Sequence, residues 1–204
     1  MMSRNQDLFT HKDRVRRAAI LCIHFLRNLA YYRAGWAVHV ERSGGSGSSH
    51  RVLRRKESQF WRTVNGNCLD TCILEWCKLF AERNGKHDWR KVVADPTGFL
   101  PSMLARLRMT EADLQAYTDE MRHYRDKFVA HLDDVHVMNI PLLRASGRSV
   151  ACLYTDLTTS PITKQYLPDA RLSAGRYYAL FANEGRHVYY QQLEAWELVT
   201  TSRS

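Results

Sequence analysis

Apolar residues recur every three or four positions over several stretches of the chain, which is the spacing of one face of an α-helix. The first stretch covers residues 13–40, and its apolar positions are Val15, Ala18, Cys22, Phe25, Leu29, Tyr32 and Trp36. The second covers residues 52–83 and ends at Asn84 and Gly85, a pair typical of a helix C-terminus. The sequence Asn-Gly-Asn at 65–67 would allow an interruption in it. Between the two helices, residues 43–49 have the Gly/Ser composition of a flexible loop.

The most regular helical pattern lies at residues 110–132. Thr110 is suited to the N-cap and Asp113 to the first turn. The apolar positions that follow span more than five turns, at Leu114, Tyr117, Met121, Tyr124, Phe128 and Leu132. Shorter helices are predicted at residues 98–107 and at 141–156, with Pro141 in the first turn of the latter.

These elements predict an all-α protein with one domain over residues 10–160. Residues 161–204 form a C-terminal extension rich in tyrosine. We expect this extension to be helical, and a hairpin around residues 183–185 is the alternative.

The charge balance favours a polyanionic partner. The 204 residues contain 30 Lys and Arg against 21 Asp and Glu, a formal net charge of +9. Contacts between basic side chains and phosphates would suit RNA, although an acidic protein would satisfy the same charge. No apolar stretch approaches the roughly 20 residues that cross a bilayer. No export signal is recognisable either, so we expect a cytosolic protein with no membrane association and with reduced cysteines.

Three of the five cysteines, Cys68, Cys72 and Cys77, lie within ten residues of one another. Their spacing differs from the paired Cys-x-x-Cys of a zinc site, and free cysteine is commonly buried. The pattern therefore favours packing in the core over a metal site.

Candidate chemistry lies at the end of the 110–132 helix. With Phe128 at the centre of the apolar face and 100° per residue, Arg125 and His131 fall about 60° to either side. Both would flank a buried interface, about 120° apart. They could act on one phosphate only if the helix bends or ends near His131, or if a second copy packs alongside.

The segment from Tyr124 to Asp133, with the sequence YRDKFVAHLD, resembles the HEPN family, and in particular its abortive-infection ribonucleases. The family motif is Arg-x(4-6)-His with a polar residue after the arginine, and Arg125, Asp126 and His131 match it. Arginine and histidine have this spacing three more times in the chain, so the surrounding residues carry the resemblance. Segments 76–80 and 87–89 are similar to the same proteins, and the resemblance extends over residues 10–160.

The resemblance implies a HEPN-like antiparallel helical bundle that forms a homodimer with a composite active site. The implied activity is RNA cleavage without metal or organic cofactor, in which the ribose 2′-hydroxyl attacks the adjacent phosphorus. DNA lacks that hydroxyl. His131 would transfer protons near neutral pH, Arg125 would stabilise charge on the phosphorus, and Asp126 would orient Arg125 or a neighbour across the dimer.

Such a protein would act as a toxin or antiphage effector, under the control of an antitoxin or regulatory protein. Asp133 stands where toxins silenced by a nucleotidyltransferase often carry tyrosine, which argues against that mode of control. The alternative function is a non-catalytic HEPN module that binds RNA or a partner protein. In it, His131 would be buried and distant from its counterpart in the other protomer. A purely structural role is a further alternative, in which Arg125 and Asp126 anchor the helix through a salt bridge and His131 is a hydrogen-bonded histidine of the core. A metal enzyme built on histidines, with His131 and the nearby His136, and on Asp133 and Asp134 has little support.

Overall fold

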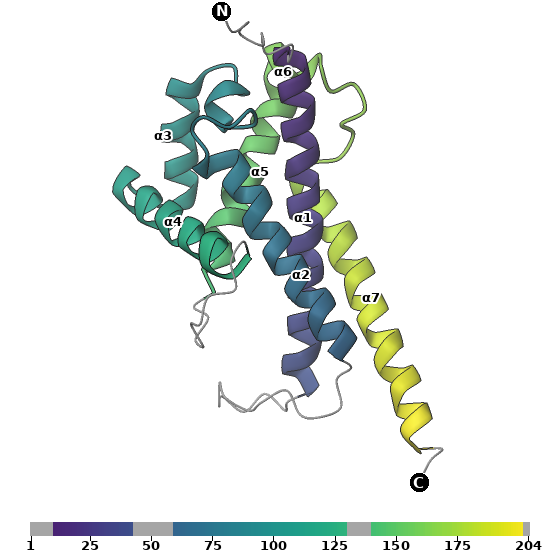
Figure 1. Cartoon of the computed structure of the whole chain (residues 1–204). Helices are drawn as coiled ribbons and strands as arrows, with labels where there is room; N and C mark the ends of the chain where they lie inside the picture. The colour runs from purple at the N-terminus through teal and green to yellow at the C-terminus, as the bar shows by residue number, and fades with distance from the viewer. Residues whose placement is uncertain (1–9, 43–58, 130–139, 202–204) are drawn as a thin grey trace, which may run out of the picture.

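The computed structural model describes residues 10–42, 59–129 and 140–201, and these residues form an all-α protein without β-strands. The long helix α1 runs through the middle of the bundle, with α2 and α7 on two sides of it and α5 behind (Figure 1). Helices α3 and α4 lie on the side away from α7. The α-helices are α1 (His11–Arg42), α2 (Gln59–Trp76), α3 (Pro96–Leu107), α4 (Glu111–Tyr124), α5 (Leu143–Thr159), α6 (Pro161–Lys164) and α7 (Ala174–Thr201).

The apolar face predicted for the first helix forms much of the core. Val15, Cys22 and Phe25 of α1 are fully buried and Leu29 is nearly so, whereas Trp36, predicted on the same face, is 56% exposed. Trp36 lies toward the C-terminal end of α1, away from the end of the bundle where α3 and α6 lie (Figure 1). The flexible loop predicted at residues 43–49 lies outside the described residues.

Trp76, at the end of α2, is the largest of the fully buried side chains. Its ring stacks on Phe80 at 5.3 Å and meets the edge of Tyr117. Its indole N–H donates a hydrogen bond of 2.9 Å to Ser149 Oγ on α5. One side chain therefore ties together the end of α2, α4 and α5.

The clustered cysteines pack in this core. Cys68, Cys72 and Cys77 are all buried. The thiol of Cys72 lies 3.7 Å from the Phe25 carbonyl oxygen, to which it donates. Among the described residues, no group of three or more metal-binding side chains is assembled.

Two predicted helices end differently from the prediction. α2 passes through Gly66 without the interruption considered at 65–67, and a Cβ at Gly66 would meet nothing within 4 Å. After Trp76 the backbone widens into one π-helical turn, η1 (Cys77–Ala81). α4 likewise ends at Tyr124 and continues as a second π-helical turn, η3 (Arg125–Val129), where a single regular helix was predicted to residue 132. Residues 130–132 lie outside the described part.

The other two predicted helices are present with shifted starts. α3 begins at Pro96 behind the N-cap Asp95, whose carboxylate accepts from the Thr97 and Gly98 amides. α5 begins at Leu143, so Pro141 precedes the helix instead of lying in its first turn.

The C-terminal extension is helical, and the hairpin alternative is wrong. α7 lies along α1, and the two helices approach closely at glycines. A Cβ at Gly35 would come within 2.7 Å of Tyr189, and one at Gly185 within 3.0 Å of Tyr31. Tyr31 also donates a 2.9 Å hydrogen bond to Glu184. The extension is thus packed into the same bundle as residues 10–160.

None of the helices in the described part of the chain is long and apolar enough to span a membrane.

Candidate functional site

Arg125 is positioned by the buried face of α4. The helix starts at a capping box, in which Thr110 Oγ1 accepts from the Asp113 amide and the Asp113 carboxylate accepts from the Thr110 amide. The N-cap predicted at Thr110 is thus present. Met121 and Tyr124 are buried, so Arg125 follows directly at the edge of the core with its side chain 22% exposed.

Two carboxylates hold the Arg125 guanidinium. Its Nε–H donates to Asp126 Oδ1 at 2.8 Å, and its Nη1 donates to Glu82 Oε1 at 3.0 Å. The hydrogen bond to Asp126 is the main cause that raises the pKa of Arg125. Nη2 has no hydrogen-bond partner among the residues that the structure describes. The guanidinium is therefore oriented, and it retains donors for a further anion.

Both carboxylates belong to the same chain as the Arg125 that they contact. Asp126, whose helical angle points away from the apolar face, pairs with the arginine next to it. Glu82 was not anticipated from the sequence, because it lies 43 residues from Arg125 and belongs to no motif. It is the first residue after η1, so the π-helical turn decides where its side chain lies.

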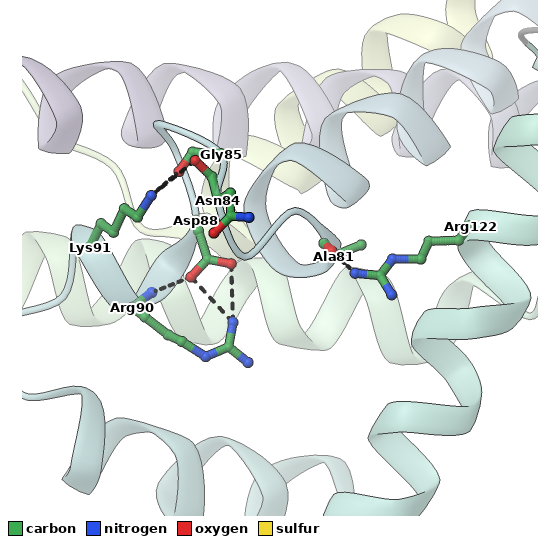
Figure 2. A network of polar contacts seen from close by, with 7 residues as sticks. All are labelled: Ala81, Asn84, Gly85, Asp88, Arg90, Lys91 and Arg122. Carbon is green, nitrogen blue, oxygen red and sulfur yellow. Dashed lines mark hydrogen bonds and ion pairs between the residues drawn. The ribbon is translucent and has the colours of Figure 1, made fainter. Parts of the chain in front are cut away.

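The two π-helical turns meet at this site. η1 packs against α4, and η3 packs against α2. Arg122 of α4 donates to the carbonyl oxygen of Ala81, the last residue of η1, one residue before Glu82 (Figure 2). π-helical turns inside α-helices are rare and are often found at functional sites. Here the two turns place Arg125 and Glu82 close enough to form an ion pair.

Burial raises the pKa of several groups in the core next to the arginine. Burial raises the pKa of Cys77 to about 11, so Cys77 is a thiol at neutral pH and no candidate nucleophile. Tyr124 donates a 3.4 Å hydrogen bond to Asp70, and burial raises the pKa of both groups. Cys77 and Tyr124 belong to the buried core next to Arg125.

The structure thus brings together two of the three predicted catalytic residues, Arg125 and Asp126. The third, His131, lies outside the described residues. So do the residues of the alternative metal site, Asp134 and His136, and Asp133 with them.

A comparison of the chain with protein-family models, with curated proteins and with solved structures gives no match. The HEPN assignment therefore depends on the resemblance in the sequence, and the activity that follows from it is a proposal.

Proposed function

We propose that the protein is a metal-independent endoribonuclease of the HEPN type that acts as a toxin or antiphage effector. Arg125 and His131 of two protomers would form the composite active site of a homodimer, and Asp126 would orient Arg125. The observation that supports this most is the state of Arg125. Its guanidinium is fixed by carboxylates on two sides at the edge of the core, yet keeps Nη2 for a phosphate oxygen.

The roles follow from the chemistry of RNA cleavage. Attack of the 2′-hydroxyl makes a crowded phosphorus that carries additional negative charge, and an oriented guanidinium stabilises that charge without reorganising. A histidine can remove the 2′-proton and return a proton to the leaving 5′-oxygen. The products would be a 2′,3′-cyclic phosphate and a 5′-hydroxyl.

The ion pair between Glu82 and Arg125 sets a condition for the binding of RNA. Two carboxylates beside one guanidinium give this part of the site a local negative charge, which opposes a phosphate. Binding of RNA would therefore displace Glu82 from Nη1, while the adjacent Asp126 keeps its contact with Nε. The proposed active form has Arg125 shared between Asp126 and the substrate.

The test is cleavage of a labelled RNA in EDTA by the wild type and by Arg125→Gln. Loss of one preorganised donor to the transition state typically costs about 100- to 1,000-fold in rate. We expect that loss for Arg125→Gln, no cleavage of a DNA of the same sequence, and unchanged activity for Arg171→Gln, whose exposed side chain lies outside the site. Equal cleavage by the wild type and Arg125→Gln would exclude the proposed role.

The second candidate is a non-catalytic module that binds RNA or a partner protein. The same ion pairs favour it, because a guanidinium between two carboxylates is also what a purely structural anchor requires. This module would be supported by a folded dimer that binds RNA without cleaving it, and whose His131→Ala variant binds RNA with the same affinity. Growth arrest on expression of the wild type in bacteria, relieved by His131→Ala, would support the nuclease.

A further inference from the structure

A pocket lies beside the candidate site, between the segment that follows η1 and the helices α3 and α4. Its floor is apolar and is formed by Phe80 and Trp89, which are buried, and by the half-buried Leu100 and Leu114. Three arginines, Arg83, Arg90 and Arg122, line it as well. We refer to these seven residues as the arginine pocket.

The three guanidinium groups of the arginine pocket differ in their contacts. Arg90 lies 4.5 Å over the ring of Trp89, and its Nη1 donates to both oxygens of the fully buried Asp88, at 3.2 and 3.0 Å. Arg122 reaches from α4 to the Ala81 carbonyl (Figure 2). Arg83 is exposed and makes no hydrogen bond or ion pair within the described residues. Two of the three are thus preorganised, and the third is available to move onto a ligand.

Directed donors, and not net charge, distinguish this pocket. Asp88 offsets Arg90, Asp119 lies 3.6 Å from Arg122, and Glu111 lines the pocket too. The three cations are therefore balanced by three acids. However, Asp88 occupies only Nη1 of the Arg90 guanidinium. In Arg122, the Ala81 carbonyl accepts from Nη2 and Asp119 lies near Nη1, which leaves Nε. The remaining N–H groups can donate to the oxygens of an oxyanion, and Nε and Nη2 of Arg90 can do so in bidentate geometry.

The apolar floor narrows the range of ligands that fit the pocket. A free sulfate or phosphate would leave Leu100 and Leu114 uncovered, whereas a flat ring system attached to the anion would bury them. Gln115, whose amide N–H groups donate to Asp119, lines the pocket with its side-chain oxygen still able to accept. These features match a phosphate joined through a sugar to a nucleobase.

We propose that the arginine pocket binds a nucleotide, with the phosphate on Arg83, Arg90 and Arg122 and the base over the apolar floor. The nucleotide can be a free mononucleotide or one unit of an RNA strand, since both present the same groups. The proposal does not rest on the proposed nuclease activity, because it is tested by binding and not by cleavage.

The experiment is calorimetric titration of the full-length protein with four probes. These are inorganic phosphate, adenosine, adenosine 5′-monophosphate and a short RNA with 2′-O-methyl groups throughout, which has no free 2′-hydroxyl and cannot be cleaved by 2′-attack. The variants are Arg83→Glu and Arg83→Lys. Arg83 is chosen because its exposed side chain has no partner to lose within the described residues, so folding is unaffected. Arg171→Glu is the control for general charge.

We expect the monophosphate to bind more tightly than adenosine or inorganic phosphate alone. Arg83→Glu should weaken it by about tenfold or more, the effect of losing one hydrogen bond to a charged group. Arg83→Lys and Arg171→Glu should retain most of the affinity. If only the methylated RNA binds, with the same dependence on Arg83, the nucleotide belongs to an RNA strand.

Three results would overturn the proposal. They are no binding of either nucleotide probe, adenosine binding as tightly as its monophosphate, and equal affinity for Arg83→Glu and the wild type. A loss of affinity in Arg171→Glu as large as that in Arg83→Glu would also overturn it, since it would mark nonspecific charge attraction.

Discussion

The ion pair between Arg125 and Glu82 gives a quantitative test of how the candidate site is built. The two charged atoms lie 3.0 Å apart, with 22% of the arginine and 44% of the glutamate side chain exposed. Unit charges about 4 Å apart interact by about 1 kcal/mol in bulk water and about 4 kcal/mol near a protein surface. Because nearly half of the Glu82 side chain is exposed to solvent and both side chains lose entropy in the pair, we expect a net coupling of about 0.5–1 kcal/mol.

A double-mutant cycle isolates this coupling. The free energy of unfolding is measured by urea denaturation for the wild type, Arg125→Gln, Glu82→Gln and the double variant. The contact between Arg125 and Asp126 is lost in both arginine variants and therefore cancels. A higher salt concentration should reduce the coupling energy, because the ion pair is partly exposed to solvent and is therefore screened. A coupling of zero, or one of opposite sign, would refute the conclusion that Glu82 holds Arg125 in place.

Three further predictions concern stability. Gly35→Ala should destabilise the protein by about 1–3 kcal/mol, because its Cβ would lie 2.7 Å from Tyr189 of α7, whereas Gly66→Ala in open space should stabilise it by about 0.5–1 kcal/mol. Calorimetry of both variants tests the close contact between α1 and α7, because a loose contact would give Gly35→Ala no cost. Trp76→Phe should lose about 1–3 kcal/mol in urea denaturation, since the hydrogen bond to Ser149 and part of the packing disappear, and a neutral result would contradict that contact. Burial raises the pKa of Asp70, so the folded state favours its protonated form and stability falls as the pH rises from the ordinary value of 3.8 through the raised one. Asp70→Asn should therefore be more stable than the wild type at neutral pH, with a gain that disappears below pH 3.8; a gain independent of pH would exclude this cause.

Much of the helical framework could be predicted from local sequence alone. The apolar period of α1 and the reciprocal Thr110 and Asp113 cap are properties of neighbouring residues, so one sequence suffices to find them. The close approach of α7 to α1 was harder to foresee. Gly35 and Gly185 give no signal until the two helices are placed side by side.

The candidate site was predicted only in part, for a related reason. The apolar period of α4 continues through residue 128, so nothing local distinguishes a π-helical turn at Arg125–Val129 from a regular helix. Whether the backbone widens there depends on packing against α2. The contribution of Glu82 depends on the same packing, because two segments distant in sequence must meet before the carboxylate reaches Arg125.

The proposal that His131 acts in metal-independent RNA cleavage is tested most directly by one measurement. Wild type, His131→Ala and His123→Ala, each confirmed as a folded dimer, are incubated with a mixed RNA pool in EDTA, and the ends of the products are identified. His123 is an exposed histidine of α4, which makes it a matched control. The account predicts 2′,3′-cyclic phosphate ends from the wild type and His123→Ala and no cleavage by His131→Ala. Cleavage by all three proteins, or by none, would contradict it.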